Sequence, residues 1–138
     1  MELPTAPQGL DKLLGFDYAE LGPDRVVVRF EVRPELLQPF GLVHGGVYCS
    51  VVESAASVGA GLWYGDAGQV VGVANHTNFL RAARSGTMTA VATPIHRGRS
   101  QQLWLVEVSD DAGRVVARGE VRLANLRSDS DGPAAAHA

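Results

Sequence analysis

The chain has 138 residues, a length typical of one domain that can bury a hydrophobic core without disulfide bonds. Hydrophobic residues make up 46% of it and charged residues 20%, which excludes a disordered chain. The net charge of −3 weighs against nucleic-acid binding, and a single cysteine, Cys49, excludes a disulfide-rich secreted scaffold. No leader-like segment or uninterrupted apolar stretch of about 18 residues is present, so we expect a cytoplasmic protein without membrane contact.

The first half of the chain predicts a short helix, one strand and one long helix. Leucines at helical spacing predict a helix within residues 8–16 that ends at Gly15. Residues 25–33 begin as a valine run and then alternate apolar and polar side chains, which indicates a half-buried strand. Residues 44–64 carry one charge, Glu53, and predict a nearly apolar helix about 30 Å long.

The second half of the chain predicts strands in succession. Four segments are rich in valine, threonine and aromatic residues: 69–80, 86–95, 101–110 and 114–126. A tight turn at residues 110–113 joins the last two of these strands. We therefore expect a single domain over residues 1–127 and a disordered tail over residues 128–138.

This order of elements predicts an α+β fold in which one antiparallel sheet curves around the long helix. One sheet covers only one side of an apolar helix. A second copy of the chain is then expected to cover the other side, so we expect a homodimer or homotetramer.

Two features of the long helix are typical of a catalytic site. The first is the pair Gly45 and Gly46 at its start, where backbone amides without an internal partner can bind an oxyanion. The alternative is that the two glycines only permit a sharp loop. The second is Glu53, a carboxylate in an apolar helix, suited to act as a general base or a nucleophile. The alternatives are an ion pair with Arg81 or Arg97, or a place on an exposed stripe.

The spacing of these groups predicts a shared site. Glu53 lies eight residues after Gly45 (53 − 45), or about 12 Å along the helix axis, too far for both to contact one carbonyl group. Antiparallel helices from two copies would bring Gly45 of one chain beside Glu53 of the other. The predicted site is therefore composite. Helical spacing also places Ser57 beside Glu53, where it can orient the carboxylate or hold water.

The segment GLVHGGVYCSVVESAAS, residues 41–57, closely resembles the hotdog-fold acyl-CoA thioesterases. The resemblance is strongest to the branch of 4-hydroxybenzoyl-CoA and 1,4-dihydroxy-2-naphthoyl-CoA thioesterases, which is related to the phenylacetate-pathway type. Many phenylacetate-type relatives carry Asp where this chain has Glu53. The resemblance covers roughly residues 14–126 and implies a hotdog fold in dimers that usually pair into tetramers.

The resemblance also implies roles for catalytic residues. The Gly45 amide would donate to the thioester carbonyl, Gln38 would help to polarise it, and His44 would sit beside the thioester. Glu53 of the partner chain would attack the carbonyl carbon or activate water, with Ser57 placing that water. Coenzyme A is then part of the substrate, and no separate cofactor is expected.

The coenzyme A end of the substrate would meet two segments, NFLR at residues 78–81 and HRGRSQ at residues 96–101. By the same resemblance, the phosphate-binding residues are Asn78, Arg81, Arg97, Arg99, Ser100 and Gln101. Some relatives have Thr where this chain has Gln101. Without the resemblance, Arg97 and Arg99 are typical of a solvated turn between strands.

The remaining candidate residues have more ordinary interpretations. Tyr48 follows the glycine pair closely and is a candidate for lining the acyl pocket, whereas Trp63, Tyr64 and Trp104 are expected in the core or an interface. No histidine pair and carboxylate show metal-ligand spacing, so no metal is expected.

The predicted function is hydrolysis of an aryl-CoA or a short- to medium-chain acyl-CoA. Two alternatives stay open. A dehydratase or hydratase of acyl thioesters would share the fold, but its histidine lies further upstream of the helix carboxylate than His44 does. A non-catalytic acyl-CoA-binding module would not need Glu53 and Gln38.

Overall fold

The computed structural model describes residues 6–128. Its elements are α1 (Gly9–Leu14), β1 (Asp17–Leu21), β2 (Val26–Glu31), the 3-10 turn η1 (Pro34–Leu36), α2 (Gly45–Tyr64), the 3-10 turn η2 (Gly65–Ala67), β3 (Gly68–Phe79), β4 (Thr87–Arg97), β5 (Gln101–Ser109) and β6 (Val115–Arg127). All but the first residue of the predicted disordered tail, residues 128–138, lie outside the described residues.

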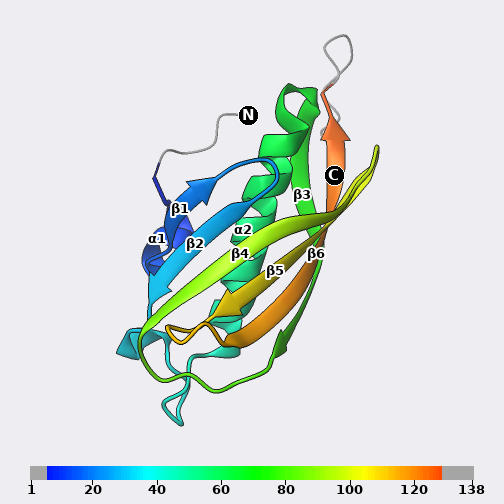
Figure 1. The fold of residues 1–138 in the computed structure, drawn as a ribbon. Helices are drawn as coiled ribbons and strands as arrows, with labels where there is room; N and C mark the ends of the chain where they lie inside the picture. The colour runs from blue at the N-terminus through cyan, green and yellow to red at the C-terminus, as the bar shows by residue number, and fades with distance from the viewer. Residues whose placement is uncertain (1–5, 129–138) are drawn as a thin grey trace.

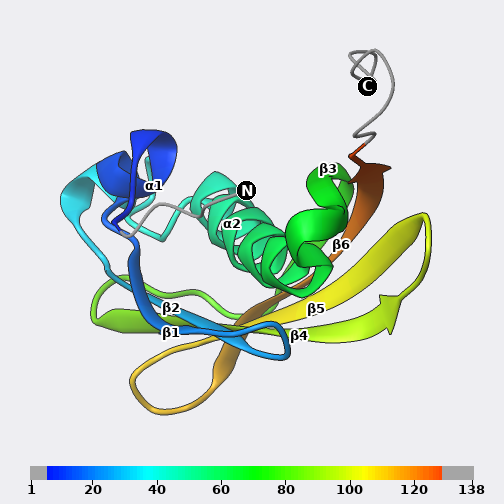
Figure 2. The same ribbon diagram turned by 90° about the horizontal axis from the view of Figure 1, so that it is seen from above.

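The six strands form one antiparallel sheet in the order β1-β2-β4-β5-β6-β3. Strands β4, β5 and β6 follow one another, whereas β3 lies beyond β6 at the edge of the sheet. Helix α2 lies across the concave face of the curved sheet, with α1 to one side (Figures 1 and 2). This arrangement confirms the predicted α+β fold of a sheet around a central helix.

Strand β1 is the element that the sequence pattern did not predict. Its residues, Asp17–Leu21, are mostly exposed and show no alternation of apolar and polar side chains. The strand forms because β2 offers it a free row of backbone groups, and the two pair antiparallel. Such an edge strand depends on its neighbour rather than on its own side chains.

The core lies between α2 and the sheet. Every fully buried position of α2 carries a small or β-branched side chain except Tyr48, which allows the sheet to approach closely. Trp104 of β5 is completely buried, and its ring lies where a side chain on Gly59 would be, only 2.6 Å from an added Cβ atom. Gly59 is therefore required by the packing of Trp104 rather than by any turn.

No helix within residues 6–128 combines the length and apolar composition that crossing a bilayer requires.

The two edges of the sheet differ in length and exposure. Strand β1 has five residues, whereas β3 has twelve, pairs with β6 alone and is exposed over most of its length. The longer edge therefore offers a row of unpaired backbone groups for further strand pairing.

Candidate active site

The first amides of α2 differ in their hydrogen bonds. The Gly46 N–H donates to Nδ1 of His44 at 2.8 Å, and the Val47 N–H donates to the His44 carbonyl at 3.0 Å. The Gly45 N–H has no acceptor within residues 6–128. Of the predicted glycine pair, Gly46 is therefore engaged as a capping partner, and Gly45 presents the donor at the positive end of the helix dipole.

A cavity of about 310 Å³ adjoins this free amide. Its walls come from the loop before α2, the start of α2 and the end of β3: Gln38, Leu42, Val43, Gly45, Tyr48, Phe79, Leu80, Arg81, Ala82 and Ala83. An added Cβ at Gly45 would meet the Phe79 ring at 2.5 Å, so a side chain there would displace that ring. The cavity therefore brings the predicted Gln38, Gly45, Tyr48 and Arg81 together.

The side-chain oxygen of Gln38 accepts a hydrogen bond within the chain, whereas its side-chain nitrogen does not donate one to the described residues. Its Oε1 accepts a hydrogen bond from the backbone N–H of Phe40. Its amide nitrogen, with two N–H donors, has no acceptor within the described residues. Gln38 therefore lines the cavity with a donor to spare, as polarising a carbonyl oxygen requires.

Glu53 lies two turns further along α2 and is half-buried. The Ser57 hydroxyl donates to its Oε2 at 3.0 Å, which confirms the predicted contact. The carboxylate rests against the α-carbon of Gly72 in β3, where any side chain would collide with it. No ion pair of Glu53 occurs within residues 6–128, so the expected alternative of a bridge to Arg81 or Arg97 is not found.

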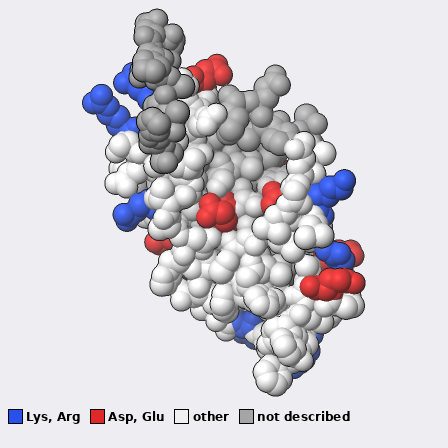
Figure 3. Space-filling view, turned by 180° about the vertical axis from the view of Figure 1, so that it is seen from behind, with Lys and Arg blue, Asp and Glu red and all other residues white. Residues whose placement is uncertain are grey.

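One row of α2 faces the exposed edge strand. The Phe79 ring covers Gly45, the Asn75 side chain donates to the Cys49 carbonyl at 3.0 Å, and Gly72 receives Glu53. On the face of the molecule opposite to that in Figure 1, two acidic groups lie near the middle, and both basic and acidic groups lie towards the rim (Figure 3). The candidate catalytic groups therefore lie beside the edge that is free to meet another chain.

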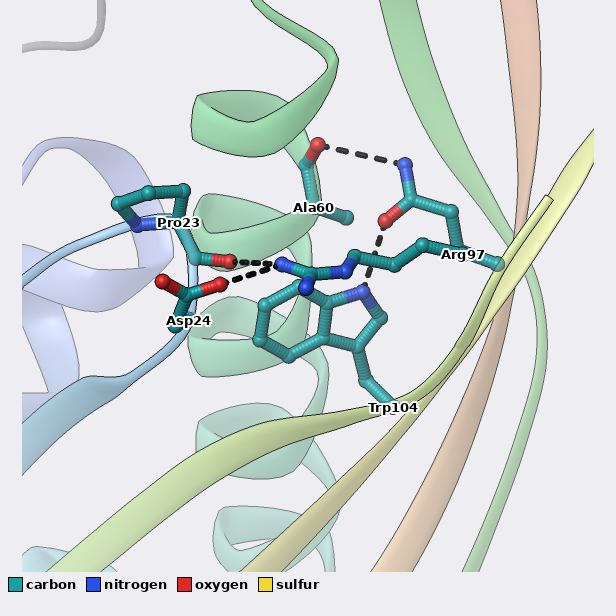
Figure 4. A network of polar contacts seen from close by, with 6 residues as sticks. Pro23, Asp24, Ala60, Arg97 and Trp104 are labelled. Atoms are coloured by element: carbon teal, nitrogen blue, oxygen red, sulfur yellow. Dashed lines mark hydrogen bonds and ion pairs between the residues drawn. The ribbon is translucent and has the colours of Figure 1, made fainter. Parts of the chain in front are cut away.

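Arg97, one of the predicted phosphate-binding residues, makes contacts within the chain. Its Nη1 donates to the carbonyl of Pro23 at 2.9 Å and to Oδ1 of Asp24 at 2.7 Å (Figure 4). Its guanidinium also lies 5.3 Å from the centre of the Trp63 ring. Arg97 thus ties the end of β4 to the loop between β1 and β2, and its predicted role in phosphate binding stays a prediction.

A second cavity, of about 430 Å³, lies at the C-terminal end of α2. It contains two of the predicted phosphate-binding residues, Arg99 and Ser100. Its walls are Trp63, Tyr64, Ala67, Gly98, Arg99, Ser100, Asn125 and Arg127. Sequence reasoning missed Arg127, because a single arginine at a strand end gives no signal of its own.

The other predicted phosphate-binding residues are exposed. Asn78 lies on β3, and Gln101 begins β5 without lining either cavity. Within residues 6–128, no three histidine, cysteine, aspartate or glutamate side chains are placed to hold a metal ion.

Comparison with known proteins gives one consistent result. Residues 40–117 match the thioesterase superfamily. The Mycobacterium tuberculosis protein Rv1847 is 54% identical over 121 residues, which cover 86% of each chain. The 1,4-dihydroxy-2-naphthoyl-CoA hydrolase of Listeria monocytogenes is 33% identical over 108 residues, covering 78% of this chain and 88% of the hydrolase.

Solved structures agree with these sequence matches. The Rv1847 structure superposes with a TM-score of 0.85 at 53% identity, covering 86% of this chain and 97% of the other. Thioesterase HI1161 from Haemophilus influenzae superposes with a TM-score of 0.82 at 29% identity, covering 88% of this chain and 86% of the other. The fold is therefore the hotdog fold that the resemblance predicted.

Proposed function

Since the chain belongs to the thioesterase superfamily and is an acyl-CoA thioester hydrolase, we propose that each of its active sites is built from two copies. The observation that carries this proposal is the separation of the free Gly45 amide from the unpaired Glu53 carboxylate. Eight residues of one helix hold them about 12 Å apart along the axis. A single carbonyl group cannot accept from the first and be attacked by the second within one chain.

A second copy packed antiparallel along α2 removes this difficulty. The exposed edge of β3, with Val73 at 59% exposure, offers both an apolar surface and unpaired backbone groups for that copy. A two-fold axis that pairs position 45 with position 53 passes through position 49, their midpoint. The two Cys49 residues would then lie next to each other at the axis.

In this site the thioester oxygen accepts hydrogen bonds from the Gly45 N–H and the Gln38 side-chain amide of one copy. These donors stabilise the negative charge that develops on that oxygen. Glu53 of the other copy attacks the carbonyl carbon or takes a proton from the attacking water, while Ser57 holds its Oε2. The carbon–sulfur bond then breaks, and coenzyme A leaves as a thiolate that takes up a proton. In the water route that proton is the one that Glu53 removed and the free acid forms directly, whereas in the nucleophilic route water then hydrolyses the mixed anhydride on Glu53 to the free acid. His44, with Nδ1 occupied by Gly46, lies beside the thioester.

The same antiparallel pairing predicts where the coenzyme A end of the substrate binds. Position 64 of the partner lies about 16 Å beyond Gly45 along the paired helices, a distance that the pantetheine arm can span. The partner's second cavity would then receive the phosphates through Arg99, Ser100 and Arg127, with Asn78 and Arg81 along the way. Guanidinium groups suit phosphate because their donors match its geometry.

We propose an aryl or short- to medium-chain acyl group as the part transferred to water. The cavity beside Gly45 is compact, and two relatives are named 1,4-dihydroxy-2-naphthoyl-CoA hydrolase. A panel of benzoyl-, phenylacetyl-, hexanoyl- and palmitoyl-CoA, followed by thiol release, tests this. A kcat/KM that is highest for palmitoyl-CoA would contradict the proposed substrate class.

Mixed dimers test the shared site. One chain carries Glu53→Gln, and the other carries Gly45→Pro together with Phe79→Ala, which makes room for the ring. Proline is tolerated at the first position of a helix and removes only the amide proton in question. We expect each variant alone to be nearly inactive and the co-expressed mixture to recover up to a quarter of the wild-type thiol release. No recovery in a purified mixed dimer would overturn the proposal.

Cross-linking tests the helix orientation. Cys49 is the one cysteine of the chain, so a short bis-maleimide can join two copies only there. We expect a covalent dimer from the wild-type protein and none from Cys49→Ser. A protein that is dimeric by light scattering but gives no covalent dimer would contradict the antiparallel pairing at position 49.

A further inference from the structure

Gly72 lies within strand β3 although its backbone does not require glycine. It is not among the glycines of residues 6–128 that have a positive φ angle, so other residues could adopt its conformation. Glycine in the interior of a strand is destabilising relative to alanine, because it loses more conformational freedom on folding. Such a glycine commonly marks a bulge or the close approach of another group. Both are found at Gly72.

The group that approaches Gly72 is the Glu53 carboxylate. A Cβ atom added at Gly72 would lie 3.0 Å from Cδ of Glu53 and 3.1 Å from its Oε1, and closer still to its Oε2. Gly86 also lies against a carboxylate, that of Asp111, but its φ of +96° already favours glycine. At Gly72 the neighbouring carboxylate, rather than the backbone, accounts for the missing side chain.

A one-residue bulge follows Gly72. Gly72 and Ala74 oppose consecutive residues of β6, which leaves Val73 without a partner in the register. In a regular strand, side chains alternate between the two faces, so positions 72 and 75 would face opposite ways. Here both Gly72 and Asn75 contact α2, because the extra residue restores the same face. Bulges often redirect side chains in this way beside active sites.

Two hydrogen bonds hold the part of α2 that carries Glu53. The Ser57 hydroxyl donates to Oε2 of Glu53 at 3.0 Å. The Asn75 side chain donates at 3.0 Å to the Cys49 carbonyl, which is also the acceptor of the Glu53 backbone N–H in a regular helix. The Thr77 hydroxyl donates to Asn75 Oδ1 at 2.7 Å and so fixes that amide. Within residues 6–128, no donor reaches Oε1 of Glu53.

We propose that Gly72 is a positioning residue for Glu53. Its bare backbone lets the carboxylate lie against β3 with Oε2 bonded to Ser57, which leaves Oε1 as the oxygen that attacks or takes the proton. The proposal rests on the proposed function, because it takes Glu53 as the reacting group. A side chain at position 72 would push the carboxylate away from Ser57, and a displacement of about 1 Å can cost about 10²-fold in rate.

Gly72→Ala tests the positioning. We expect kcat for thiol release to fall by about 10- to 100-fold, with KM within about threefold, because the carboxylate moves while the coenzyme A contacts remain. The melting temperature should be unchanged or higher, since alanine suits a strand better than glycine and Glu53 can turn towards solvent. A kcat within threefold of wild type would overturn the proposal.

A shorter carboxylate provides the rescue. Aspartate at position 53 lacks one methylene group and no longer reaches the methyl group added at position 72. In the Glu53→Asp background, Gly72→Ala should therefore change kcat by no more than about twofold, a strong departure from additivity. A loss caused by altered pairing of the two copies would persist in this background. Two losses that simply multiply would show that Gly72 does not act through Glu53.

Gly113→Ala is the matched control. Gly113 lies in the turn between β5 and β6 with a φ of +76°, and an added Cβ would meet no atom within 4 Å. The same change there should lower the melting temperature through backbone strain and leave kcat per folded molecule unchanged. A fall in kcat as large as that of Gly72→Ala would mean that any destabilising glycine substitution slows the enzyme, which would overturn the positioning role.

A crystal structure of Gly72→Ala separates this proposal from the proposed function. We expect the Glu53 carboxylate to have left Ser57. If it still bonds Ser57 while Glu53→Gln is inactive, the positioning role is wrong and the proposed function stands. If the carboxylate has moved but Glu53→Gln releases thiol at the wild-type rate, Gly72 does position this carboxylate, and the proposed role of Glu53 in hydrolysis fails.

Discussion

The two ends of α2 use their polar groups in opposite ways. At the C-terminal end, Arg97 bonds Pro23 and Asp24 (Figure 4). Gln102 bonds Ala60, Asn125 and Trp104. At the N-terminal end, the Gly45 amide and the Tyr48 hydroxyl have no partner within the described residues. Paired groups such as those at the C-terminal end stabilise the fold, whereas an unpaired donor beside a cavity, such as the Gly45 amide, is available to a ligand. Variants at the N-terminal end should therefore lower kcat, whereas variants at the C-terminal end should lower the free energy of unfolding.

The largest effect is expected for Glu53→Gln. It keeps the size of the side chain but removes the charge that attacks or deprotonates, so kcat should fall by about 10³-fold. Thermal unfolding should change little, because no ion pair within residues 6–128 depends on this carboxylate. Thiol release with excess acyl-CoA measures the loss. Activity within tenfold of wild type would exclude Glu53 from the chemistry.

Gly45→Pro in the Phe79→Ala background should reduce kcat by about 10²- to 10³-fold, the cost of one oxyanion donor. Phe79→Ala alone is the first control. Gly45→Ala with Phe79→Ala is the second, since it adds a Cβ atom but keeps the N–H. If both double variants are equally slow, crowding rather than the lost amide is responsible.

Gln102→Leu tests the opposite end of the helix. The Trp104 indole N–H is then left buried without its partner, and the Ala60 carbonyl and Asn125 Oδ1 each lose one donor, which should lower the free energy of unfolding by about 2–3 kcal/mol. Thermal unfolding measures the loss, and kcat per folded molecule should stay near that of wild type. A large fall in kcat at unchanged stability would break the distinction between the two ends.

The smallest effects separate two neighbouring arginines. Arg99→Met should raise KM for acyl-CoA about tenfold, because one charged contact to a phosphate is lost. Arg97→Met should leave KM within about twofold and lower stability by at most about 1 kcal/mol, since its partner Asp24 is 76% exposed. Steady-state kinetics with both variants show which substitution raises KM. The reverse order would favour Arg97 over Arg99 as the phosphate-binding residue.

Much of the fold was predictable from local patterns. The apolar run that becomes α2, the turn at residues 110–113 and the strand at residues 25–33 each carry their own periodicity or turn residues. Strand β1 was not predictable, because its polar residues adopt a strand only by pairing with β2. The second cavity was also missed, because residues 63, 99 and 127 meet there only after folding.

The sequence by itself determined the kinds of group available: one glycine pair before a helix, one carboxylate within it, and a serine one turn later. Tertiary structure decided which of these groups are free. Gly72 of β3 leaves room for the Glu53 carboxylate without pairing its charge, while Asp24 engages Arg97 across 73 positions of the chain. The physical reason is that hydrogen bonds between distant segments depend on packing, which no local pattern of residues encodes.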